Sequence, residues 1–302
     1  MGALVWAAGK GRIFLVAGLL GGLFLPGIAA AMTPWLPHMV AGLLFLSALR
    51  IGPRQAAGSL REAGTALWIT LVYQLAVPLV CVILVVALGV ADHPMALALV
   101  LVASASSISG APNFSVMLGA DPAPALRMLI LGTALLPLTI LPVFWLMPGL
   151  GDATAVALAA LRLLVVIAGA VALAFALRLT VLKTPVARTI SAIDGASVIL
   201  LAVIVVGLMS AVGPALKSDL AGLGKWLVFT CIVNFGGQVL AYLAMRRRQD
   251  VIPASIIAGN RNIALFLVAL PPDVTEPLLL FIGCYQIPMY LTPIVMRAIY
   301  RS

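Results

Sequence analysis

Charged side chains are scarce in this chain of 302 residues, since Asp, Glu, Lys and Arg make up only 9% of it. An ordinary soluble domain carries about 25% of such residues, and it needs polar side chains to cover its surface. The apolar share is 64%. This composition excludes a soluble enzyme, a disordered protein and a free nucleic-acid-binding protein. It predicts a polytopic integral membrane protein whose outer surface faces lipid.

Cysteine and histidine are also rare, with three and two residues. Cys81, Cys231 and Cys284 lie far apart in apolar runs, without the C-x-x-C spacing that is typical of metal sites. We interpret them as small buried hydrophobic residues. The sequence shows no cluster of carboxylates, His or metal ligands at membrane depth. We therefore expect no enzyme, no catalytic residue, no metal, no cofactor and no nucleic-acid partner.

Long apolar runs fill the chain and leave no loop long enough to fold as a separate domain. Because a spanning helix needs about 20 mostly apolar residues, we predict an all-α integral membrane protein with ten spans in a lipid bilayer. The predicted spans are 13–31, 37–50, 64–88, 95–118, 124–147, 155–180, 190–212, 223–245, 251–270 and 276–298.

Lysine and arginine are distributed unevenly between the two sides of this arrangement. Lys217 and Lys225 lie on one side, and Arg162 and Arg261 fall inside spans. Basic residues favour the cytoplasmic side. We therefore predict a multi-pass protein of the bacterial cytoplasmic (inner) membrane with both termini in the cytoplasm, which requires an even number of spans. The other 14 of the 18 basic residues are on the predicted cytoplasmic side: Lys10, Arg12, Arg50, Arg54, Arg61, Arg127, Arg178, Lys183, Arg188, Arg246, Arg247, Arg248, Arg297 and Arg301.

The first apolar run also has features of a signal peptide. Lys10 and Arg12 precede it, and the alanines at 29–31 resemble a cleavage site. The run is longer than the usual apolar core of a signal peptide, and its removal would leave an odd number of spans. We expect it to remain as the first span.

The spans divide into two halves of five, residues 1–152 and 153–302. An odd number per half makes the halves enter the membrane from opposite sides, which predicts an inverted repeat. The fourth span of each half has small and polar residues at mid-membrane depth, at 104–113 and 258–262. We expect Gly110, Pro112 and Gly259 to let these helices unwind around a binding site. The alternative is that the small residues only permit tight helix packing.

The two segments carry a resemblance to a known family. Ser109-Gly110-Ala111-Pro112-Asn113 matches a family stretch at Gly, Ala and Asn, and the segment from Ile257 to Asn262 matches another at Gly and Asn. The chain resembles the bile acid:sodium symporter family over nearly its whole length, and more loosely the arsenite and auxin-type carriers. The resemblance implies broken crossing helices at spans four and nine. It also implies a panel of spans one, two, six and seven, and a core of spans three to five and eight to ten.

The departures from the family concern its sodium ligands. Where sodium-coupled members carry those ligands, this chain has Pro112, Leu126, Ile130, Ile257 and Arg261. The resemblance therefore implies a transporter without the family type of sodium coupling. The remaining candidate ion ligands are Gln74 and Asn113.

Arg261 is the most informative single residue, because a charge at the bilayer centre costs roughly 2.5–3.5 kcal/mol on insertion scales. It either pairs with carbonyls that the broken helices free, or binds an anionic substrate. Tyr285 and Gln286 fall where family members carry cavity residues, although each is equally consistent with a helix–helix hydrogen bond. The candidate substrate-binding residues are Arg261, Asn262, Asn260, Asn113, Ser109, Tyr285 and Gln286.

Two functions remain open. The first is a secondary transporter that moves a small amphipathic organic anion by alternating access. The second is a non-transporting membrane sensor or scaffold that retains the transporter fold. The oligomeric state is not predicted.

Cysteine labelling tests the predicted orientation. After the three native cysteines are replaced, Arg54→Cys, Pro185→Cys and Arg247→Cys should react with an impermeant maleimide only from the cytoplasm. Asp92→Cys, Asp152→Cys and Ser218→Cys should react only from outside. Labelling of Arg247→Cys from outside would contradict the ten-span arrangement and the inverted repeat.

Overall fold

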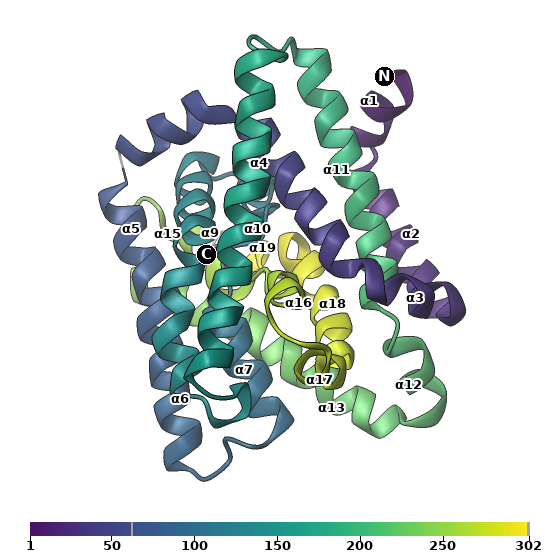
Figure 1. Cartoon of the computed structure of the whole chain (residues 1–302), viewed down its shortest axis with the longest axis vertical. Helices are drawn as coiled ribbons and strands as arrows, with labels where there is room; N and C mark the ends of the chain where they lie inside the picture. The colour runs from purple at the N-terminus through teal and green to yellow at the C-terminus, as the bar shows by residue number, and fades with distance from the viewer. Residues whose placement is uncertain (62, 301–302) are drawn as a thin grey trace. The chain divides into compact units, whose positions relative to one another are not determined.

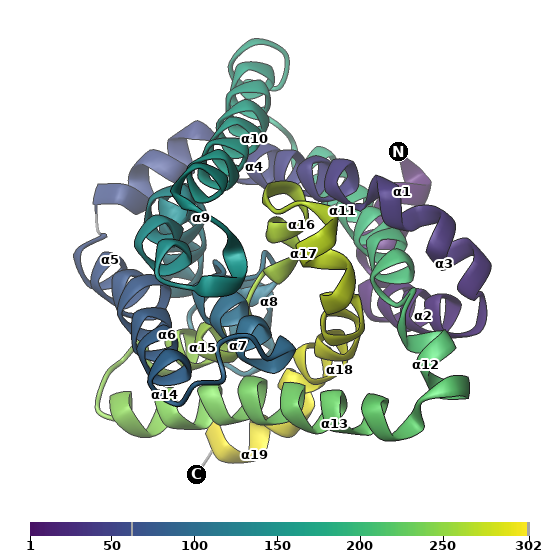
Figure 2. The same cartoon turned by 60° about the horizontal axis from the view of Figure 1, so that its bottom comes forward.

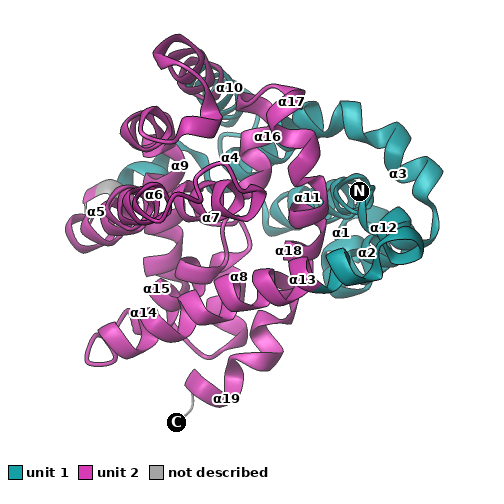
Figure 3. Ribbon diagram, turned by 90° about the horizontal axis from the view of Figure 1, so that it is seen from below, with its two compact units in different colours: residues 1–58, 164–224 teal, residues 59–163, 225–302 magenta. Residues whose placement is uncertain are grey.

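α-Helices form nearly all of the chain in the computed structural model, which describes residues 1–61 and 63–300. Within those residues, extended backbone pairs only at an isolated antiparallel bridge between Ser107 and Arg261. Arg301, one of the predicted cytoplasmic residues, lies outside the described residues. The helices divide into two units, residues 1–58 with 164–224 and residues 59–163 with 225–302 (Figure 3).

Seven helical stretches of the described chain are long and apolar enough to cross a membrane, and a bent pair of helices near the N-terminus makes an eighth. Many large apolar side chains on them face outward: Ile83 is 61% exposed and Leu240 is 70% exposed. Lipid accepts such a surface, whereas water does not. The chain is therefore an all-α, multi-pass membrane protein. The seven stretches are Pro26–Ser59, Gly64–Ala87, Pro122–Leu146, Ala153–Thr180, Ala187–Ser218, Leu220–Met245 and Pro272–Tyr300.

The boundary between the first two predicted spans differs in the structure. The helix that starts at Gly11 ends at Phe24, and the next helical stretch runs from Pro26 to Ser59. Leu25 has a φ of −119° and a ψ of 61°, outside the helical range. Proline disfavours the helical conformation in the residue before it, so the chain breaks at Leu25 rather than between 31 and 37.

Unit 1 is built around α11 (Ala187–Leu208), against which α1 (Gly2–Ala8), α2 (Gly11–Phe24) and α3 (Pro26–Met32) pack. α2 approaches α11 closely, because a Cβ atom on Gly18 would lie 2.6 Å from the carbonyl oxygen of Ala202. Small residues allow such close packing of membrane helices. The unit also contains η1 (Thr33–Trp35), most of α4 (Leu36–Arg61), the second part of α10 (Ala153–Thr180), α12 (Val212–Ser218) and the start of α13 (Leu220–Cys231).

Helix α4 bends at Gly52, which has a φ of 73° and precedes Pro53. Glycine tolerates this left-handed conformation, and it also leaves room for an arginine. A Cβ atom on Gly52 would lie 2.6 Å from Nη2 of Arg178. Two residues earlier, Arg50 forms an ion pair with Asp194 of α11. The second predicted span, 37–50, thus ends close to the bend at Gly52, with Arg50 just before the bend and Arg178 in contact with it.

Unit 2 holds two long helices that are each interrupted by a π turn. α5 (Gly64–Leu71) continues through η2 (Val72–Ala76) into α6 (Val77–Ala87), and α13 continues through η4 (Ile232–Gly236) into α14 (Gly237–Met245). π turns are rare and occur frequently at functional sites. α9 (Pro122–Trp145) packs against α5, η2 and α7 (Pro94–Ser104) (Figure 2).

The remaining elements of unit 2 follow α7 in the chain, and Figure 1 labels several of them. They are α8 (Ala111–Met117), η3 (Pro148–Leu150), the first part of α10, α15 (Val251–Gly259), η5 (Ile263–Leu265), α16 (Phe266–Ala269), α17 (Pro272–Thr275), η6 (Glu276–Leu278), α18 (Leu279–Val295) and α19 (Arg297–Tyr300).

Candidate functional site

The two polar segments singled out in the sequence break their helices and lie side by side in unit 2. α7 ends at Ser104 and α8 begins at Ala111, whereas α15 ends at Gly259 and η5 begins at Ile263. The main-chain N–H of Asn262 donates to the carbonyl oxygen of Ser106 at 2.7 Å. The N–H of Ile108 donates to the carbonyl oxygen of Asn260 at 3.3 Å. Main-chain groups at membrane depth need such partners, and the two breaks supply some of them to each other.

The glycines at the breaks act differently from the sequence expectation. Gly110 has ordinary dihedral angles, with a φ of −80°, and Gly259 has no positive φ either. Gly259 instead allows close contact, because a Cβ atom there would overlap the carbonyl oxygen of Asn234 and lie 2.6 Å from Cγ of Gln238. Pro112 lies in the first turn of α8, where its missing N–H costs no hydrogen bond.

Arg261 lies between the two breaks and is only 4% exposed. Its Nη2 donates to the carbonyl oxygen of Tyr73 at 2.7 Å and to that of Ala103 at 3.0 Å. The first carbonyl belongs to the π turn η2 and the second to the last turn of α7, where helix carbonyls lack helical partners. The guanidinium also lies 5.3 Å from the ring centroid of Tyr73, a cation–π arrangement. Arg261 therefore supplies hydrogen bonds and a positive charge to main-chain carbonyls that have no partner within their own helices.

Asn260 is fully buried in a polar network. Its Nδ2 donates to the carbonyl oxygen of Ile256 at 2.8 Å, and its Oδ1 accepts from Thr292 at 3.1 Å and from Asn234 at 3.3 Å. Gln238 donates to Oδ1 of Asn234 at 2.8 Å. Each polar atom of the Asn260 side chain therefore has a protein partner, and the network joins α15, α18 and η4.

Two side chains of α18, Tyr285 and Gln286, make hydrogen bonds within the helix packing. The Tyr285 hydroxyl donates to the carbonyl oxygen of Gly259 and accepts from the N–H of Arg261 at 3.2 Å. Nε2 of Gln286 donates to the carbonyl oxygen of Ile282 at 3.0 Å. Both side chains are buried. Tyr285 thus holds the end of α15, while Gln286 bonds back onto its own helix.

Three candidate residues retain access from outside the packed interior. Asn113 on α8 is exposed, and Ser109 and Asn262 are half-buried. α8 packs against α15, so these residues belong to one region of unit 2. The candidates therefore divide into a buried group that ties the helices together and an accessible polar group beside the breaks.

The two candidate ion ligands do not share a cavity. Gln74 lies in η2, and its Nε2 donates to the carbonyl oxygen of Gly132 at 3.1 Å. It lines a small cavity that Arg261 also lines, whereas Asn113 does not line it. Within the residues that the structure describes, no group of three or more His, Cys, Asp or Glu side chains is placed to hold a metal ion.

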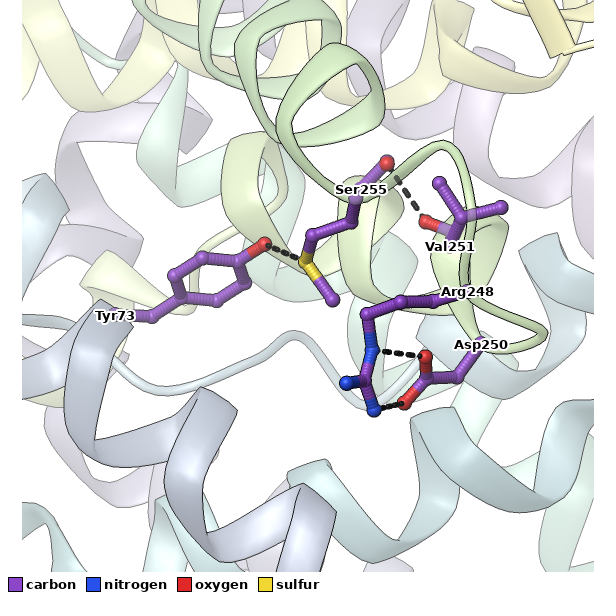
Figure 4. A network of polar contacts seen from close by, with 6 residues as sticks. Tyr73, Arg248, Asp250, Val251 and Ser255 are labelled. Carbon is purple, nitrogen blue, oxygen red and sulfur yellow. Dashed lines mark hydrogen bonds and ion pairs between the residues drawn. The ribbon is translucent and has the colours of Figure 1, made fainter.

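Polar contacts also hold the start of α15 (Figure 4). Arg248 donates through Nε and Nη2 to the two oxygens of Asp250, at 2.9 and 3.3 Å. The hydrogen bond to Asp250 raises the pKa of Arg248 above its ordinary value. Inside the helix, Ser255 donates to the carbonyl oxygen of Val251 at 2.7 Å. Tyr73 donates through its hydroxyl to Sδ of Met245 at 3.5 Å, so one residue of η2 reaches both the break and the end of α14.

Tyr73 and Thr292 were missed by the sequence analysis. Tyr73 contributes a main-chain carbonyl, whose availability depends on the π turn and not on the side chain. Thr292 lies four residues after Pro288 and one before Pro293 in α18. A threonine between two prolines in an apolar span is a signal that could have marked it, since prolines free carbonyls within a helix.

Gly259→Ala tests the close contact between α15 and η4. The added methyl group would overlap the main chain of Asn234, so we expect a loss of about 1–3 kcal/mol or more from overpacking. Thermal melting in detergent measures it. Gly236→Ala is the matched control, because a Cβ atom on Gly236 meets nothing within 4 Å. Equal melting temperatures for the two variants would contradict the contact.

The chain matches no protein-family model and no curated protein sequence.

Proposed function

We propose that this protein is a secondary transporter that moves a small amphipathic organic anion across a bacterial cytoplasmic membrane by alternating access. We also propose that it is a divergent, non-enzymatic member of the bile acid:sodium symporter family. The observation that carries the proposal is the pair of broken helices, which exchange main-chain hydrogen bonds around the buried Arg261. Paired broken helices in corresponding halves are the best sequence-level indication of a transporter binding site.

The helices support ten spans in two inverted halves. The seven long apolar stretches correspond to predicted spans two, three, five, six, seven, eight and ten, and the bent N-terminal pair corresponds to span one. Spans four and nine are the two broken helices, which are too short to count as single spans. The π turns add a second correspondence, because η2 lies in the third span and η4 in the eighth. Each half therefore has its π turn one span before its break.

The two units support the proposed panel and core. Unit 1 contains predicted spans one, two and seven, residues 164–180 of span six and the first two residues of span eight. Unit 2 contains spans three to five, nine and ten, residues 155–163 of span six and the rest of span eight. Alternating access requires two bodies that change position around a fixed site. Both broken helices and all candidate site residues belong to unit 2, so the proposed site stays intact when the bodies move.

We assign the accessible polar group to the anion. Asn113, Ser109 and Asn262 offer hydrogen-bonding side chains beside the breaks. Arg261 would act on the anion through its charge and not through a direct hydrogen bond. Its guanidinium donates to two main-chain carbonyls, and a charge still attracts an anion strongly in a medium of low dielectric. An anion at this position also offsets part of the cost of a buried charge.

A sensor or scaffold is the second candidate, and one observation favours it. Arg261 donates to the main chain, and the polar side-chain atoms of Asn260 all have protein partners. These hydrogen bonds fix both side chains within the protein, which suits a site that does not rearrange. A sensor would bind the anion at the same accessible group without moving it across the membrane.

Uptake into proteoliposomes distinguishes the two candidates and tests the coupling. We expect accumulation of at least one amphipathic carboxylate from a panel, and the same affinity when choline replaces sodium at constant ionic strength. The reason is that Ile257 and Arg261 stand where the family has sodium ligands. A tenfold gain in affinity with sodium, about 1.4 kcal/mol, would refute sodium independence. Binding without accumulation would favour the sensor.

Arg261→Gln tests the role of the charge. The variant removes a buried charge that attracts the anion in a medium of low dielectric, so we expect carboxylate affinity to fall by about ten- to hundredfold. Arg261→Lys should recover part of it, because the charge remains and the planar fork is lost.

Arg247→Gln, which removes an exposed charge from the α14–α15 loop, is the matched control and should leave affinity unchanged. A lower melting temperature for Arg261→Gln, with wild-type affinity in the folded protein, would make Arg261 a purely structural residue.

A further inference from the structure

Five polar atoms of unit 2 are buried and have no hydrogen-bond partner among the described residues. Two belong to Ser106 and Tyr290, and the other three are Oγ1 of Thr70, Oε1 of Gln74 and Nε of Arg261. The three residues are 4%, 1% and 4% exposed. Leaving a buried polar group unpartnered is costly, and native structures rarely do so. Three such atoms in one region point to a ligand that completes their hydrogen bonds.

The same three residues line one cavity. Its volume is about 10 Å³ of space open to the centre of a water molecule, and its other lining residues are Tyr73, Ser107, Met128, Gly132 and Ile257. A single water molecule needs roughly 10–15 Å³ measured in this way. The cavity therefore has room for one water-sized ligand and nothing larger.

The chemistry of the three atoms selects among water-sized ligands. Nε of Arg261 is a donor, and the Thr70 hydroxyl both donates and accepts. Oε1 of Gln74 is an acceptor, and its identity follows from Nε2, which donates to the carbonyl oxygen of Gly132. A sodium ion would lie beside the guanidinium, which repels it. A chloride ion would lie against Oε1 of Gln74, which also repels it.

We propose that this cavity binds one water molecule, which accepts from Arg261 and donates to Gln74 and Thr70. The water joins η2 and α5 to the break that follows α15. It adds a third support to the guanidinium, beside the carbonyls of Tyr73 and Ala103. A neutral ligand here also means that no exchangeable ion binds between the third span and the ninth. This inference rests on the contacts alone and does not depend on the transport proposal.

Thr70→Val tests the water, because the proposal predicts whether the melting temperature of the full chain in detergent falls or rises. With water bound, the substitution removes a partner of the water, and the melting temperature falls by a few degrees. In a dry cavity it removes an unpartnered hydroxyl, and the melting temperature rises. Thr139→Val is the matched control, because the buried Thr139 hydroxyl donates to the carbonyl oxygen of Leu136 in its own helix, at 3.3 Å, and Thr139 does not line the cavity. A Thr70→Val melting temperature equal to or above that of wild type overturns the proposal.

A second pair of variants covers the case in which Thr70→Val does not fold. Thr70→Ser keeps the hydroxyl and Thr70→Ala removes it, so Thr70→Ser should melt at the higher temperature. The reverse order overturns the proposal.

Salts distinguish water from an ion. The probes are sodium chloride, choline chloride and sodium gluconate at equal ionic strength, because a bound ion raises the melting temperature by mass action. Equal responses of wild type and Thr70→Val to the three salts support water. A rise with sodium or chloride that disappears in Thr70→Val shows an ion in the cavity and overturns the proposal.

Discussion

The hydrogen bonds of the Arg261 guanidinium join the π turn η2 to the two broken helices, and the rest of the candidate site depends on this junction. In a bilayer every main-chain polar group needs a partner inside the protein. The π turn at η2 and the end of α7 each leave a carbonyl without one, at Tyr73 and Ala103, and Arg261 donates to both. A charge is expensive at this depth, but it satisfies two carbonyls from segments that are far apart in the chain.

The same constraint is met differently in the second half of the chain. There the helix that ends at a break is α15, and the carbonyl of Gly259 accepts from Nδ2 of Asn234 at 2.5 Å and from the Tyr285 hydroxyl. Asn234 lies in η4, as Tyr73 lies in η2. Both π turns therefore contact the break that follows α15: η2 through the main-chain carbonyl of Tyr73, which accepts from Arg261, and η4 through the side-chain amide of Asn234.

The breaks could be predicted because small and polar residues at 104–113 and 258–262 stand out in apolar surroundings. The directions in which the side chains of these two segments point could not be predicted. Asn260 was expected to bind substrate, but an irregular segment has no fixed periodicity, and its side chain points into the network with Thr292. The first two spans were misplaced because Pro26 stops a helix inside a continuous apolar run. Pro78 is a signal for the unpaired carbonyl of Tyr73, since proline supplies no N–H five residues after it. Nothing in the sequence indicated that Arg261 would donate to this carbonyl.

A π turn holds one residue more than the α-helical turn that it replaces. Since each residue of an α-helix turns it by about 100°, deleting one residue within 72–76 would restore a regular helix and rotate all of α6 relative to α5. After a deletion at 74–76 the carbonyl of Tyr73 would still find no donor in the helix, because Pro78, which has no N–H, would then lie four residues after it. Arg261 would keep this acceptor while α6 turned. A single-residue deletion at this place therefore changes which face α6 presents, while it leaves a carbonyl partner of the buried arginine in place.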